Sequence, residues 1–258
     1  ALAGALAGSK LDTEVAHVEA GLRSFDRTMP EETNRVLVDH VADYLFAPTD
    51  ESARLLRQEG IDADRITVTG NTIVDILAWA SELVDTESSV ITELGLTPGK
   101  FCLLTAHREE NVDSRERFEA LLDGVSEYAH RAGVPVVYPI HPRANERLEE
   151  FDLAVPAEVH LVDPVDYLDF LKLEREAALV FTDSGGVQEE TCVLGTPCVT
   201  LRYNTERPET IAAGSNCLAG LSPEHIVTLA ELMSDKDGDW SSPFGDGRAG
   251  YRIFEALE

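Results

Sequence analysis

The sequence predicts an α/β fold in which parallel sheets carry helices on both faces. Short apolar runs of strand length alternate with helix-length segments along the chain. Hydrophobic residues make up 43% of the 258 residues, which is enough to bury a core. The alternation loosens once, from Ser81 to Lys100, so we place a domain boundary within Gly70–Lys100.

Eight segments are expected to be strands, with helices between most of them. Pro30 opens one helix with two acids beside its positive end, Thr49 caps the next helix and Ser114 caps a third. Further helices are expected over Thr72–Leu83 and Gly247–Glu258. The expected strands are Val15–Val18, Tyr44–Ala47, Ile66–Thr69, Phe101–Ala106, Val134–Ile140, Val159–Leu161, Ala178–Thr182 and Cys198–Leu201. Only about three of them precede the boundary, so the first domain looks truncated at its start.

The charge balance is strongly acidic, with 48 Asp and Glu against 21 Lys and Arg and a formal net charge of −27. Such a surface repels nucleic acids and anionic membranes, so neither is an expected partner. The acids are spread over the chain and form no single block, as in a folded protein from a high-salt cytoplasm. A special cationic partner is the alternative. No apolar run approaches the roughly 18 residues of a membrane span, and no signal peptide is visible.

The four cysteines form no CxxC pair. Free buried thiols in a reducing compartment are the expected state, and no metal site is predicted. Together with the missing signal peptide, this favours a cytoplasmic location.

Ionisable residues follow several of the expected strands. Ligands of open α/β sheets bind beyond the carboxyl ends of the strands, so we expect these side chains to line one cleft. They are Glu19, His107 with Arg108, His141 with Arg143, the Asp183–Gly186 turn, and Arg202.

The turn Ser184-Gly185-Gly186 is predicted to hold a phosphate. Glycines let the backbone approach a ligand and adopt positive φ, and the following helix start offers free N–H groups. An ordinary turn with a serine cap is the alternative. Glu190 favours the nucleotide site, because a carboxylate one turn further on suits the hydroxyls of a ribose. The pattern therefore predicts phosphate donors followed by a diol acceptor.

Two carboxylates are candidates for proton transfer. Glu19 directly follows a buried strand, where an unpaired acid is costly, and Glu31 stands at a helix start. The alternatives are a salt bridge for Glu19 and helix-dipole stabilisation for Glu31. Two acids converging on one cleft can divide the acid and base roles. His107 either donates to a phosphate or caps a helix, and His141 allows the same two interpretations.

Seven segments resemble, in order, those of the non-hydrolysing UDP-N-acetylglucosamine 2-epimerases. They are "HVEAGLRS", "PEETNR", "VTGNTIVD", "TAHREEN", "YPIHPR", "TDSGGVQEE" and "TERPET". The resemblance covers nearly the whole chain. It implies two Rossmann-like domains in the glycosyltransferase-B architecture, with the nucleotide bound mainly by the second domain. It also implies inversion at C2 of UDP-GlcNAc to give UDP-ManNAc, through elimination of UDP and its re-addition to a 2-acetamidoglucal. Neither NAD nor metal is needed, and a homodimer is implied.

The resemblance assigns roles residue by residue. Glu19, Glu31 and His107 match catalytic positions, while Arg202, Arg207 and Glu209 lie in matching segments without an assigned role. On this basis we expect residues 1–72 to belong to the first domain, 73–242 to the UDP-binding domain and 243–258 to a terminal helix packing back on the first. The residues expected at UDP are His107, Arg108, His141, Ser184, Gly185, Gly186, Glu190 and Arg202.

The chain departs from the family pattern at its start. A basic, glycine-containing loop and a Gly-Asp-Thr segment, whose Asp is an acid/base in the family, have no counterpart here. We therefore expect a fragment that binds UDP but turns over slowly or not at all. The alternatives are a hydrolysing epimerase that releases free ManNAc, a glycosyltransferase of similar architecture and a non-catalytic UDP-sugar binding module.

Overall fold

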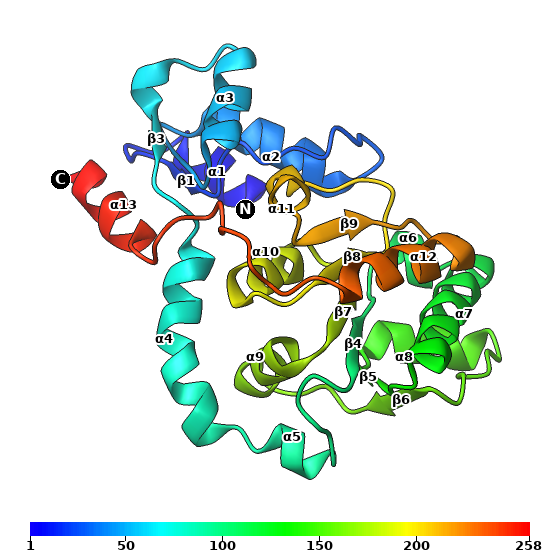
Figure 1. Ribbon diagram of the computed structural model, residues 1–258. Helices are drawn as coiled ribbons and strands as arrows, with labels where there is room; N and C mark the ends of the chain where they lie inside the picture. Colours follow the sequence, from blue (N-terminus) through cyan, green and yellow to red (C-terminus); the bar gives the residue numbers. More distant parts are fainter. The chain divides into compact units, whose positions relative to one another are not determined.

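A computed structural model describes all 258 residues and separates them into two compact units, each with its own parallel sheet (Figure 1). The first unit comprises Ala1–Trp79, Asn204–Glu209 and Ser242–Glu258. The second comprises Ala80–Tyr203 and Thr210–Ser241. The chain first passes between them inside α4 (Thr72–Glu87), a helix four residues longer at its end than expected.

The first unit is built on three parallel strands in the order β1-β2-β3. Their bounds are Ala16–Val18, Tyr44–Ala47 and Ile66–Val68. Its small core consists of apolar side chains from the strands and from α3, among them Leu45, Leu56 and Ile66. The helices and the 3-10 turn of this unit are α1 (Leu2–Gly8), α2 (Pro30–Val41), α3 (Asp50–Gln58), η1 (Ala63–Arg65) and α13 (Ala249–Leu257).

The second unit holds six parallel strands in the order β6-β5-β4-β7-β8-β9. The chain runs outward from β4 through β5 to β6, and then returns to the other side of β4 with β7. The strand order thus reverses beside β4, which is where open α/β sheets bind ligands. The strands are β4 (Cys102–Thr105), β5 (Val136–Pro139), β6 (Val159–Val162), β7 (Leu179–Thr182), β8 (Cys198–Thr200) and β9 (Asn216–Leu218).

Helices cover both faces of this sheet (Figure 1). Alternate strand residues point to opposite faces, so Leu104 and Phe181 join one apolar cluster and Leu103 and Val180 the other. The first cluster is completed by α7, α8 and α12, the second by α5, α9 and α10. The helices of this unit are α5 (Val90–Glu93), α6 (Glu109–Val112), α7 (Arg115–Ala132), α8 (Pro142–Glu150), α9 (Tyr167–Glu176), α10 (Gly185–Leu194) and α12 (Pro223–Ser234), while α11 (Pro208–Ala213) spans the change of unit.

All eight expected strands are confirmed, within two residues at each end. The predicted helix starts are confirmed too: Pro30 is the first residue of α2, and the side chains of Thr49 and Ser114 accept from backbone N–H groups three residues on. The strand β9 was missed, so the second sheet has six strands and not five. It is only three residues long and contains Asn216, which disfavours a strand.

The C-terminal segment belongs to the first unit. Phe244 accepts a hydrogen bond from Asn71 N through its carbonyl oxygen. Asp75 accepts from the backbone N–H groups of Ala249 and Gly250, at 3.0 and 2.9 Å, and so fixes the first turn of α13. A carboxylate at a helix N-terminus is favoured by the partial positive charge there.

We expect salt to stabilise this protein. At a net charge of −27, carboxylates repel one another across the surface. The Debye length falls from about 10 Å at 0.1 M salt to about 3 Å at 1 M, which removes most of that repulsion. Urea unfolding in rising KCl should therefore show a rising free energy of unfolding. Sorbitol at equal osmolality is the control, since it screens no charge, and an equal response to both would contradict the prediction.

No helix of the chain has both the length and the apolar character needed to cross a membrane.

Candidate functional site

Four predicted site residues lie at the carboxyl ends of neighbouring strands of the second sheet. His141 follows β5, His107 follows β4, Ser184 follows β7 and Arg202 follows β8, and these strands are consecutive in the sheet. All four strands are parallel, so their carboxyl ends share one edge. This edge flanks the strand-order reversal beside β4.

The Ser184 turn leaves the start of α10 open. Ser184 is in an extended conformation, and its side chain makes no capping hydrogen bond to the helix. The alternative of a serine cap is therefore wrong. The expectation of positive φ is also wrong, because neither Gly185 nor Gly186 has it. The value of Gly186 is its lack of a side chain: a Cβ there would meet only Ser184 Oγ, at 3.9 Å. A small anion can thus approach free N–H groups and the positive end of a ten-residue helix.

Glu190 lies one turn further along α10 and is 7% exposed. The Tyr167 hydroxyl donates to its Oε1 at 3.1 Å. Burial raises the pKa of Glu190, while Tyr167 and then Glu174 oppose that rise. The carboxyl group is thereby held in place, with acceptor capacity left for a diol.

Asp183 organises the loop that carries His107. Its side chain is fully buried and accepts hydrogen bonds from His107 N, Arg108 N and Asn111 Nδ2, at 3.0–3.1 Å. The loop after β4 is therefore tied to the end of β7. Asp183 was expected at this edge only as part of the turn, without a role of its own. Its signal was a carboxylate directly after an apolar strand, where burial requires partners.

The His107 ring stays close to Asp183 but does not cap a helix. Its Nδ1 lies 3.4 Å from Asp183 Oδ1, and its ring centroid lies 5.7 Å from that of His141. Burial lowers the pKa of His107, Asp183 opposes this, and His141 and Arg108 lower it further. The imidazole is thus kept neutral near pH 7, with one ring nitrogen as a donor and the other as an acceptor. The Arg108 side chain donates from Nε to Asp183 O at 2.9 Å.

His141 does cap a helix. Its Nδ1 accepts from Arg143 N at 3.2 Å at the start of α8. The Arg143 guanidinium is engaged by Glu109 and Asp113, at 2.7 and 2.5 Å. The capping interpretation is therefore confirmed for His141.

Arg202 is 1% exposed, and its Nε lies 3.5 Å from Glu110 Oε1. The guanidinium is therefore buried next to Glu110 of α6.

Glu19 stands on a strained turn of the first unit. It follows β1 with φ of 64°, a left-handed conformation that is unusual for a residue with a side chain. Two residues on, Gly21 has φ of 85°, and a Cβ there would lie 2.4 Å from Ser52 O. The buried Asp39 accepts from Gly21 N at 3.2 Å and pairs with Arg23 at 2.7 Å. The contacts of Asp39 therefore hold the turn in place, while the Glu19 side chain remains 42% exposed.

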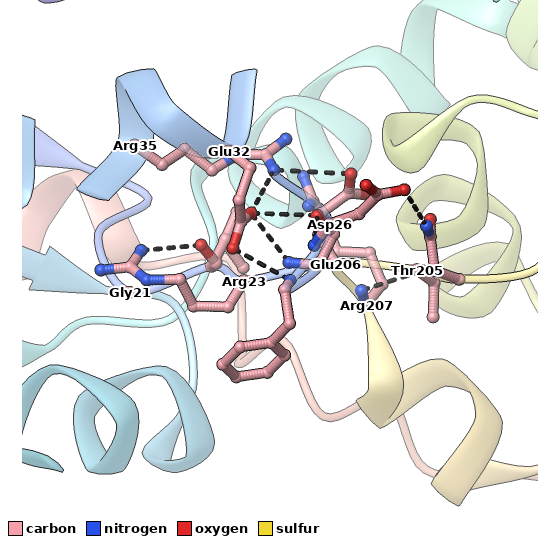
Figure 2. Close-up of polar contacts among 12 residues, drawn as sticks. Gly21, Arg23, Asp26, Glu32, Arg35, Thr205, Glu206 and Arg207 are labelled. Carbon is pink, nitrogen blue, oxygen red and sulfur yellow. Dashed lines mark hydrogen bonds and ion pairs between the residues drawn. The ribbon is translucent and has the colours of Figure 1, made fainter. Parts of the chain in front are cut away.

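The two adjacent glutamates of α2 have opposite environments. Glu31 is exposed, whereas Glu32 is buried. The Glu32 carboxylate accepts from Ser24 N, Phe25 N and Arg35 Nη1, at 2.9, 3.0 and 3.4 Å. Glu32 and Arg35 are labelled in Figure 2. Glu32 therefore holds the loop before α2 in place, and Glu31 is the one with a carboxylate open to solvent.

The segment Asn204–Glu209 supplies further charged groups to the first unit (Figure 2). Arg35 Nη1 lies 3.4 Å from Glu206 Oε1, and Arg207 Nη2 lies 3.9 Å from Glu19 Oε2. Glu209 accepts from Thr49 Oγ1 at 2.5 Å. No role could be predicted for Arg207 from the sequence, and the structure places it beside the acid Glu19.

Two cavities of this unit contain neither Glu19 nor Glu31. One of about 320 Å³ lies past β2 and β3, and one of about 460 Å³ lies beside α2. No group of three or more His, Cys, Asp or Glu side chains is arranged to hold a metal ion.

Comparisons with known proteins find similarity to 2-epimerases of UDP-sugars. The family model of UDP-N-acetylglucosamine 2-epimerase matches residues 1–258. The chain is 47% identical to the UDP-N-acetylglucosamine 2-epimerase of Methanocaldococcus jannaschii, over 99% of this chain and 72% of the relative. It is 39% identical to a UDP-2,3-diacetamido-2,3-dideoxy-D-glucuronate 2-epimerase of Pseudomonas aeruginosa, over 99% and 71%. A crystal structure of the M. jannaschii enzyme with UDP-GlcNAc and UDP superimposes with a TM-score of 0.94, over 99% of this chain and 72% of that one.

Proposed function

Because the chain belongs to the UDP-N-acetylglucosamine 2-epimerase family, we propose that it inverts C2 of UDP-GlcNAc to give UDP-ManNAc. UDP leaves by elimination, a 2-acetamidoglucal forms, and UDP returns after a proton has been delivered to the opposite face of C2. Atoms and charge balance without an oxidant, because the departing UDP and the C2 proton are both restored.

The open start of α10, followed by the buried Glu190, carries the proposal. Free N–H groups and Ser184 Oγ are suited to the phosphate oxygens of UDP, and they take up negative charge as UDP departs. Glu190, held by Tyr167, is suited to the ribose hydroxyls. His107, kept neutral beside Asp183, can donate to a phosphate oxygen or to the leaving group.

Glu19 and Glu31 are the proposed proton-transfer groups. Inversion at C2 needs groups on both faces of the sugar, so two carboxylates are expected. The exposure of both side chains leaves them free to meet a substrate. Arg207 Nη2 lies 3.9 Å from Glu19 Oε2, so a cation stands beside the proposed base.

The proposal also names the sugar of the substrate and the oligomeric state of the protein. The Pseudomonas relative carries the name of a different sugar, so UDP-GlcNAc and a 2,3-diacetamido glucuronate are both test substrates, with UDP-GlcNAc proposed on the higher identity. We also propose a cytoplasmic homodimer. The four free cysteines support the reducing compartment.

The test is incubation of the chain with UDP-GlcNAc in D₂O, followed by NMR of the products. We expect UDP-ManNAc carrying deuterium at C2, and UDP binding by calorimetry. Free ManNAc would indicate the hydrolysing reaction, and transfer of the sugar without inversion a glycosyltransferase. Binding of UDP with no deuterium at C2 would leave only a binding module.

A further inference from the structure

Glu174 is an acid in the core of the second unit that the proposed function does not use. It lies on α9 and is 0% exposed. Neither of its carboxyl oxygens is in hydrogen-bonding geometry with a donor or an acceptor. Burying a polar group without a partner costs stability, and a charged one costs far more. We therefore expect the Glu174 carboxyl group to be uncharged. The presence of a polar side chain at this buried position also requires an explanation.

Its surroundings supply that reason. The helix α9 packs on α10, which carries Glu190. Burial and then the charge of Glu190 raise the pKa of Glu174 well above its usual range. Burial, the charge of Glu190 and the Tyr167–Glu190 hydrogen bond also raise the pKa of Tyr167, and the charge of Glu174 adds to that rise. Glu174, Tyr167 and Glu190 thus form one interacting group, with Glu174 at its buried end.

We propose that Glu174 is a positioning residue, a neutral carboxylic acid that donates a hydrogen bond to the Glu190 carboxylate from behind. Two donors, Tyr167 and Glu174, then hold Glu190 from the protein side and leave its remaining lone pairs for the two ribose hydroxyls of a nucleoside diphosphate. This inference rests on the proposed function. Forming this bond breaks no other, because neither Glu174 carboxyl oxygen has a hydrogen-bond partner to give up.

The arrangement predicts that binding and stability change in opposite directions. A Glu174→Met variant removes a buried unpaired acid and should unfold at higher urea concentration than the wild type. It should also lose about tenfold in UDP affinity, the effect of one hydrogen bond to a charged group. Glu174→Gln keeps a neutral donor and should restore UDP binding.

The probes are UDP and 2′,3′-dideoxy-UDP, titrated by calorimetry into wild type, Glu174→Met, Glu174→Gln and Glu176→Met. The last variant is the control, because Glu176 is on the same helix but pairs with Lys172 and Arg175. We expect the preference of the wild type for UDP over the dideoxy analogue to fall about tenfold in Glu174→Met alone.

The possible results distinguish a failure of the role of Glu174 from a failure of the proposed function. An unchanged preference in Glu174→Met, or an equal loss for both ligands, overturns the role of Glu174 and leaves the proposed function standing. Failure of Glu174→Gln to restore the preference overturns it as well. A wild type that binds neither ligand overturns the proposed function and this inference together.

Discussion

Replacing Glu19 with glycine should stabilise the protein and sharply lower its turnover. Glu19 has φ of 64°, and a non-glycine residue held there stores strain on the order of 1 kcal/mol. Glycine adopts this conformation without a steric penalty. The lost contact with Arg207 is weak, because the two groups are 3.9 Å apart and Glu19 is 42% exposed. The free energy of unfolding should therefore rise, by up to about 1 kcal/mol.

Turnover should fall by about 10²–10⁴, the usual contribution of a positioned acid or base. The measurements are urea unfolding and the rate of deuterium entry at C2 of the sugar. Glu19→Gln should lose the same activity without the gain in stability, since glutamine keeps the strain. Asp152→Gly is the matched control, because Asp152 also has a left-handed φ, 49°, but lies after α8 in the second unit and is not among the proposed site residues. It should gain stability and keep its activity. Retention of turnover by Glu19→Gly would remove Glu19 from the mechanism.

The parallel sheets could be predicted from the sequence because strand patterns are local. Leu103 and Leu104 are apolar since both faces of the sheet are buried, and such runs stand out between helices. The caps at Thr49 and Ser114 are local signals of the same kind. The strand β9 was not predicted, because a strand of three residues that begins with Asn216 is too short to show an alternation of apolar and polar residues.

The site was only partly predictable, because the roles of its acids depend on contacts between distant residues. Glu31 and Glu32 are adjacent and chemically equal, and only the loop at Ser24 and Phe25 decides which is buried. Glu174 stands between Leu173 and Arg175 in a helix with two further acids, so its immediate neighbours in the sequence do not distinguish it from those less buried acids. Because the chain has 48 Asp and Glu residues, the composition does not identify the few that are buried.

The Asp183→Ala substitution is expected to have the largest effect on the second unit. The buried carboxylate accepts from His107 N, Arg108 N and Asn111 Nδ2, and its loss leaves these donors without that acceptor. Each hydrogen bond to a charged group contributes about 1.5–3 kcal/mol, so we expect a loss of about 3 kcal/mol or more in the free energy of unfolding. The His107 loop should detach from β7, and UDP affinity should fall at least about tenfold.

Asp183→Asn and Asp113→Ala separate the roles of charge and of burial. Asparagine keeps one acceptor oxygen at the same place, so Asp183→Asn should lose less stability than Asp183→Ala. Asp113 also accepts from two groups, Arg143 and Arg147, but its side chain is 30% exposed and water can replace it. Its removal should cost no more than about 1 kcal/mol. Urea unfolding and UDP calorimetry measure both effects, and equal losses in Asp183→Ala and Asp113→Ala would show that Asp183 does not organise the site.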